Sequence, residues 1–198
     1  ALERGVNFID TANVYSAGAS EHFVGAALQG GRRASVVLAT KAFFPQDQND
    51  PNARGLSRRH LIEACEASLK RLQTDWIDLY QVHRPQSDIP IDETLRALDD
   101  LIRQGKVRYI GSSNLAAWQI TDADWIARTR GLERFVSAPN HHNTLGRGGG
   151  AEGGPALPPP GVLPPGRPAR LLHRVSGVSP QTPADHQDLG VEEHLQVG

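Results

Sequence analysis

Four residues that can exchange protons follow short apolar runs in this sequence. Asp10 and Tyr15 belong to the stretch FIDTANVY, Lys41 closes LATK, and His83 closes YQVH. A tyrosine, with an unperturbed pKa of about 10, donates protons poorly near neutrality. A lysine ammonium beside the phenol stabilises the phenolate and lowers that pKa, and an aspartate keeps the lysine charged and in place. The set therefore predicts a general acid, with the histidine hydrogen-bonded to the oxygen of a carbonyl substrate.

The segments that carry these residues alternate between strand and helix patterns. Apolar, β-branched runs predict strands at 6–9, 35–40, 76–82, 107–112 and 134–138. Amphipathic periodicity predicts helices over 21–30, after an N-cap at Ser57, over 91–105 and over 116–131. The second of these helices has one apolar face, formed by Leu61, Ile62, Cys65, Leu69 and Leu72. Alternation without a hairpin implies right-handed crossovers and a parallel sheet.

Polar residues at successive strand ends distinguish between the two common parallel architectures. Asp10, Lys41, His83 and the pair Ser113 and Asn114 each stand where a predicted strand ends. Strand ends converge on one mouth in a (β/α)₈ barrel, whereas they spread along a row in an open sheet. In addition, no G-x-G-x-x-G motif follows the first strand, which argues against a dinucleotide-binding open sheet. We therefore expect an α/β fold of the TIM-barrel type.

Composition excludes several classes of partner. The chain has 198 residues, 38% of them hydrophobic, and a net charge of −1, so the charge balance gives no reason to expect nucleic acid or an anionic membrane as a partner. Cys65 is the single cysteine, which excludes an intramolecular disulfide and a cysteine zinc cluster. We expect Cys65 to be a core residue, no metal site, and a cytoplasmic protein.

The composition changes near residue 139. Every Trp, Tyr and Phe lies at or before Phe135, whereas proline and glycine accumulate in stretches such as GRGGGAEGGPALPPPG. Such a segment buries too little apolar surface to offset the entropy of ordering it. We therefore divide the chain into a folded part at 1–138 and a disordered or irregular Gly/Pro/Arg-rich tail at 139–198.

Several motifs of the first part resemble the aldo-keto reductase family. They are FIDTANVY with GASEHFVGAAL, LATK, TDWIDLYQVHRP and PIDETLRALDDLIRQGKVRYIGSSN, followed by the helix that begins AWQ, and they stand in the family's order. The resemblance covers roughly 1–138 and implies strands 2 to 6 of the barrel. It implies NADPH-dependent reduction of aldehydes or ketones, with Tyr15 as the catalytic tyrosine assisted by Lys41, Asp10 and His83. Ser113 and Asn114 match the family's pair that binds the nicotinamide carboxamide.

The resemblance ends abruptly. Pro139 stands where the family has a glutamine, and His142 where it usually has an aromatic residue. Permitted codons for VLPPGRPARLLHR, read one nucleotide later, give SYLPGARLGFFTG, which resembles the family segment PYFPLASGFFTG. We therefore hypothesise a frameshift between residues 138 and 150, which sequencing of the DNA tests.

Three functional readings stay open at this point. The first is an NADPH-dependent reductase with a small-molecule carbonyl substrate. The second is a cofactor-sensing regulatory or binding subunit, as in the potassium-channel β subunits that belong to the same family. The third is a non-functional gene fragment. The sequence makes no prediction of the oligomeric state or of which carbonyl compound is reduced.

Overall fold

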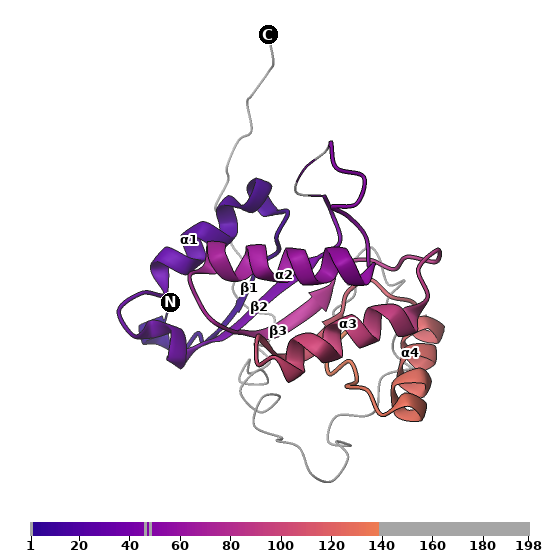
Figure 1. Ribbon diagram of the computed structural model, residues 1–198. Coiled ribbons are helices and arrows are strands. Elements are labelled where there is room, and N and C mark those ends of the chain that lie inside the picture. Colours follow the sequence, from indigo (N-terminus) through magenta and orange to yellow (C-terminus); the bar gives the residue numbers. More distant parts are fainter. Residues whose placement is uncertain (1, 46, 48, 139–198) are drawn as a thin grey trace, which may run out of the picture. The chain divides into compact units, whose positions relative to one another are not determined.

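The structure is a computed structural model that describes residues 2–45, 47 and 49–138 (Figure 1). The tail at 139–198 and the hypothesised frameshift lie outside the described residues. The helices are α1 (Ala19–Ala27), α2 (Arg58–Leu72), α3 (Ile91–Arg103) and α4 (Ala117–Arg130), and the strands are β1 (Phe8–Asp10), β2 (Val37–Ala42), β3 (Ile77–Val82) and β4 (Val107–Ser112). Three short 3₁₀ helices, Leu2–Arg4, Tyr15–Gly18 and Arg32–Ser35, complete the elements of the described residues.

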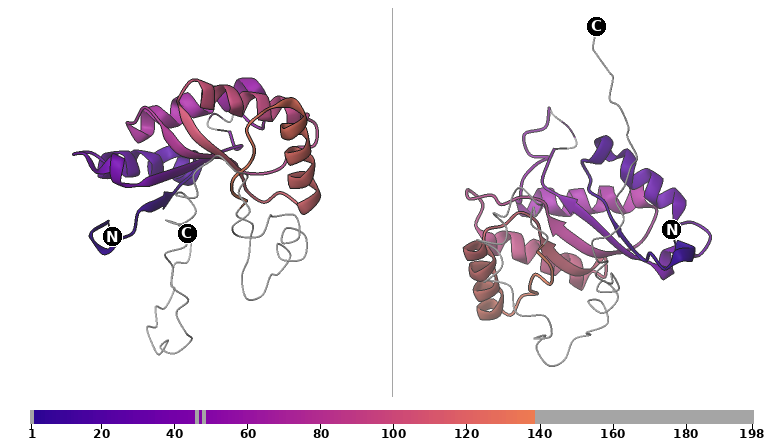
Figure 2. Two further views of the ribbon diagram at one scale, coloured as in Figure 1. Left: turned by 90° about the horizontal axis from the view of Figure 1, so that it is seen from below. Right: turned by 180° about the vertical axis from the view of Figure 1, so that it is seen from behind.

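The four strands form one parallel sheet in the order β1-β2-β3-β4. A helix follows each strand, and Figure 2 shows α2 and α3 packed on the same face of the sheet, with α1 beside α2 and α4 beside α3. This arrangement confirms the predicted α/β fold and agrees with a partial (β/α)₈ barrel. The carboxyl ends of parallel neighbours lie at one edge of the sheet, so residues that follow the strands come together there.

Three predicted boundaries differ from the structure. Residues 32–35 form a 3₁₀ helix, so β2 starts at residue 37, two residues later than the predicted start at residue 35. The strand therefore contains Lys41 instead of ending before it. The first helix ends at Ala27, because the chain turns before Gly30, which has a positive φ. The strand predicted at 134–138 is reduced to an isolated parallel bridge between Phe135 and Ile110.

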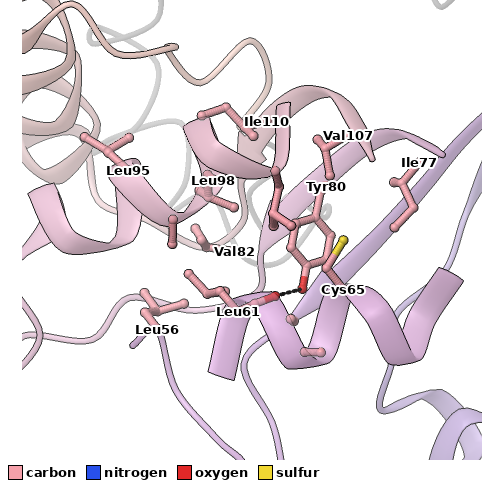
Figure 3. Packing of buried hydrophobic residues seen from close by; sticks show 14 of the residues in the cluster. Leu56, Leu61, Cys65, Ile77, Tyr80, Val82, Leu95, Leu98, Val107 and Ile110 are labelled. Atoms are coloured by element: carbon pink, nitrogen blue, oxygen red, sulfur yellow. Dashed lines mark hydrogen bonds between the residues drawn. The ribbon is translucent and has the colours of Figure 1, made fainter. Parts of the chain in front are cut away.

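The hydrophobic core lies between the sheet and the helices (Figure 3). Tyr80 of β3 is fully buried there, and its hydroxyl donates a hydrogen bond to the Leu61 carbonyl of α2 at 3.2 Å. Ser57 caps α2 as predicted, since its hydroxyl accepts a hydrogen bond from the His60 amide. Cys65 lies in this core, where burial raises the pKa of its thiol to about 12. A thiol held protonated in this way is a packing residue, as predicted.

One buried charge in the sheet has a structural role. Asp78 of β3 accepts a hydrogen bond from the Leu38 amide at 3.0 Å and forms ion pairs with Arg33 and Arg108 at 2.7 and 3.0 Å. Both guanidinium groups also stack on the Trp76 ring, at 4.5 and 4.7 Å from its centroid. These contacts tie β2, β3 and β4 together and compensate the buried carboxylate.

Candidate active site

Asp10 and Lys41 form an ion pair across two neighbouring strands. Asp10 ends β1, and Lys41 lies near the end of β2, where its ammonium contacts one Asp10 carboxylate oxygen and donates a second hydrogen bond to the Thr11 carbonyl at 3.0 Å. Lys41 is 5% exposed. A buried ammonium is tolerated when it is paired and hydrogen-bonded, so these contacts account for the charge inside the sheet.

Tyr15 reaches the same place from the loop after β1. The loop turns sharply, with Ser16 and Ala17 both in the left-handed region at φ 49° and 51°. Residues other than glycine rarely adopt this conformation, and such strain is found most often near functional sites. The Tyr15 side chain is 41% exposed, and the Lys41 ammonium lies 5.3 Å from the centre of its ring. The phenol is therefore accessible from solvent and close to a positive charge.

His83 directly follows β3 and faces the phenol. Its backbone amide donates to the Ala42 carbonyl at 3.0 Å, and its imidazole meets the Tyr15 ring edge to face, with the ring centres 5.8 Å apart. Burial lowers the pKa of His83 below its usual value of 6.5, and the positive charges of Lys41 and Arg84 lower it further, whereas the Asp10 carboxylate acts in the opposite direction. His83 is therefore uncharged at neutral pH.

Ser113 and Asn114 adjoin this group. The Ser113 amide follows β4 and donates to the Val82 carbonyl at 2.8 Å. Asn114 has a φ of 59°, and its Nδ2 donates to the His83 carbonyl at 3.2 Å and to the Ser113 hydroxyl oxygen at 3.0 Å. All six residues singled out from the sequence thus lie at the carboxyl edge of the sheet.

The two residues of the predicted cofactor pair fit a carboxamide. A carboxamide presents one acceptor and two donor hydrogens, and a hydroxyl beside a second amide supplies complementary groups. Ser113 is buried, and its hydroxyl is positioned by Asn114.

Sequence reasoning missed two buried polar residues at this edge. Asn13 is fully buried, and neither polar atom of its side chain has a hydrogen-bond partner among the described residues. Gln81 of β3 is 2% exposed and donates from Nε2 to the second Asp10 carboxylate oxygen at 3.2 Å. A signal for Gln81 was present, because it lies two positions before His83 and strand alternation puts both on one face.

Comparison with known proteins shows to which family this chain belongs. The Aldo/keto reductase family model matches residues 1–148. The chain belongs to the aldo/keto reductase family. Two of its family relatives are the versiconal hemiacetal acetate reductase of Aspergillus parasiticus, 41% identical over 165 residues, and the aldo-keto reductase dtxS3 of Metarhizium robertsii, 42% identical over 170 residues. These matches confirm the resemblance predicted from the motifs.

The matches extend over part of each relative. Each of these two alignments covers 74% of this chain and 48% or 46% of the relative, so the chain spans about half the length of the curated relatives it matches. A third relative, from Schizosaccharomyces pombe, is named as a voltage-gated potassium channel subunit beta and is 40% identical over 149 residues, which is 74% of this chain and 43% of the relative.

Two other kinds of site are absent from the described residues. Within them, no three side chains of His, Cys, Asp or Glu lie close enough to hold a metal ion together. None of the helices in the described part of the chain has the length and apolar character needed to cross a membrane.

Proposed function

We propose that this chain takes part in the NADPH-dependent reduction of aldehydes or ketones to alcohols, with Tyr15 as the general acid. The observation that carries the proposal is the placement of the Lys41 ammonium, paired with Asp10, at 5.3 Å from the Tyr15 ring. Nearby positive charge favours the phenolate that remains after proton donation. Tyr15 is thereby suited to give its proton to the substrate oxygen while the carbonyl carbon is reduced.

His83 and Asp10 have supporting roles in this proposal. The uncharged imidazole of His83 donates one hydrogen bond to the substrate oxygen and orients it toward the phenol. Asp10 balances the charge of Lys41 and holds its ammonium in place. Ser113 and Asn114 would hold the carboxamide of a nicotinamide at the same edge of the sheet, and the chemistry that such a cofactor would supply there is the hydride.

The proposal is tested on the full chain in two steps. NADPH binding is measured by fluorescence, and turnover is then measured with a reactive aldehyde. Tyr15→Phe and Lys41→Met should each lower turnover by about 10²-fold or more, because a positioned general acid contributes a factor of this size. Tyr109→Phe and Lys70→Met are the matched controls and should retain turnover, since Tyr109 lies in the first half of β4, before its carboxyl end, and Lys70 is an exposed residue of α2. Full activity in both site variants would overturn the assignment.

A binding or regulatory role is the second candidate, favoured by the relative named as a potassium channel subunit. NADPH binding without turnover of any aldehyde would support this candidate. Absence of both would contradict both candidates and support a non-functional product.

A further inference from the structure

We infer that Gln81 is a positioning residue of this site, which fixes the Asp10 carboxylate so that Asp10 in turn holds Lys41. The inference rests on the function proposed for the site. Gln81 lies within β3, 2% exposed, and its neighbours in register are Lys41 on β2 and Gly111 on β4. Buried polar side chains are seldom without a hydrogen-bond partner, and in Gln81 it is Nε2 that has one, whereas Oε1 has none among the described residues.

The two oxygens of the Asp10 carboxylate have different partners. Oδ1 accepts a hydrogen bond from Gln81 Nε2 at 3.2 Å, and Oδ2 contacts the Lys41 ammonium. Gln81 thus reaches across β2, which lies between β1 and β3 in the sheet. The two contacts together determine both the position and the plane of the carboxylate.

Asp10 has a particular need for a second anchor. It is the last residue of a strand of three residues, and its side chain is 44% exposed, against 6% for Lys41. An exposed carboxylate can rotate toward water, which would leave the buried ammonium of Lys41 poorly compensated. An amide donor limits this rotation without adding a positive charge that would compete with Lys41 for the carboxylate.

Gly111 preserves the space that Gln81 occupies. A Cβ atom at position 111 would lie 3.2 Å from Gln81 Cγ and 2.6 Å from the Ser137 hydroxyl oxygen. Gly111 does not adopt a positive φ, so the chain needs glycine here for space and not for backbone conformation. Glycine at this position therefore leaves room first for Ser137 and second for the Gln81 side chain.

Two substitutions of Gln81 separate positioning from packing. Gln81→Met keeps the length of the side chain but removes the donor. Gln81→Glu keeps the shape, loses the donor when the new carboxyl is ionised, and regains one when it is protonated. Gln29→Met is the matched control, because Gln29 is an exposed glutamine in the turn after α1, where its amide donates to the Gly25 carbonyl at 3.0 Å. Urea unfolding of each variant reports whether it is folded.

The first readout needs no turnover. Reductive methylation of the full chain, followed by peptide mass mapping, gives the rate for Lys41 relative to Lys70 and Lys106, which account for the other lysines of the sequence. Gln81→Met should raise the relative rate at Lys41 by about threefold or more, because loss of one hydrogen bond is worth a factor of this order. Burial and the neighbouring Asp10 carboxylate should raise the pKa of the new carboxyl above its unperturbed value of about 4.3. Gln81→Glu should therefore match Gln81→Met at about pH 8 and move toward the parent chain as the pH is lowered to about pH 6.

The second readout is steady-state kinetics. Gln81→Met should lower kcat about tenfold and leave KM within about twofold, because misplacement of a catalytic group affects the reaction more than substrate binding. Folded variants with unchanged Lys41 labelling and unchanged kcat would overturn the inference and leave the proposed function intact. If Gln81→Met does not fold, labelling of Gln81→Glu that is independent of pH would overturn it. A parent chain without turnover, in which Gln81 variants still expose Lys41, would support the positioning role and contradict the proposed reaction.

Discussion

Thr40 and Lys41 are adjacent in β2, and their side chains serve two different ion pairs. Strand alternation directs Lys41 to Asp10 and Thr40 to the other face, where its hydroxyl donates to Glu21 at 2.6 Å. Glu21 is fully buried and also pairs with Arg71 at 2.7 Å. The face turned toward the helices therefore holds a charge that stabilises the fold, while the opposite face holds the charge proposed for chemistry.

The Glu21 ion pair gives a stability prediction. Arg71→Ala should lower the free energy of unfolding by about 3 kcal/mol, because it leaves a buried carboxylate without its countercharge. Adding Glu21→Gln to Arg71→Ala should recover part of that loss. Arg59→Ala, which breaks the exposed pair with Glu63, is the control and should leave the urea midpoint unchanged. Equal midpoints for Arg71→Ala and Arg59→Ala would contradict the structural role of Glu21.

At the scale of elements, α1 and α2 make an unusually close contact. A Cβ atom on Gly25 of α1 would lie 2.7 Å from the Arg71 carbonyl oxygen and from the Leu72 carbonyl carbon and oxygen. Glycine disfavours helix by about 1 kcal/mol relative to alanine, so its presence in α1 needs a packing reason. The close approach provides that reason and keeps α1 near the Glu21 ion pair.

The direction in which one substitution changes the free energy of unfolding tests this contact. Gly25→Ala should reduce the free energy of unfolding by about 1–3 kcal/mol, the usual cost of overpacking, although helix propensity alone predicts a gain. Ala26→Gly, at the exposed neighbouring position, serves as the comparison and should cost about 1 kcal/mol through propensity. A Gly25→Ala chain that is more stable than the parent in urea titration would show that the helices are not in close contact.

For the whole molecule, the buried His60 and the half-buried His83 couple stability to pH. Burial lowers the pKa of His60 below 6.5, with Glu63 and Asp50 acting in the opposite direction, and burial likewise lowers the pKa of His83. In the unfolded chain these two imidazoles bind protons near pH 6.5, whereas in the folded chain they bind protons only at lower pH. The free energy of unfolding should therefore be at its full value above about pH 6.5 and fall below it, by at most about 1.4 kcal/mol per pH unit for each histidine.

Urea titrations at about pH 7.5 and pH 5.5 measure this dependence. His60→Gln should show a smaller loss of stability between the two pH values, whereas His22→Gln, at an exposed position, should behave like the parent chain. An unchanged pH dependence in His60→Gln would exclude His60 as a source of the effect.

The sequence by itself determined the fold class, the order of the elements and the family. Strand and helix patterns are local, so runs such as the one before His83 and the amphipathic face of α2 predict elements without tertiary information. The sequence also predicted that Asp10, Lys41 and His83 are neighbours, because parallel strands bring their carboxyl ends to one edge of the sheet. That these residues act in catalysis stays a prediction.

Only the tertiary structure decided how the charges in the sheet are compensated. Gln81 contacts Asp10 across β2, and Gly25 admits the α2 backbone, yet neither partner is near in sequence. The extent of β2 past Lys41 likewise depends on a preceding 3₁₀ turn and on pairing with β3. Contacts of this kind depend on the register between strands and on the distance between helices, which local residue patterns do not encode.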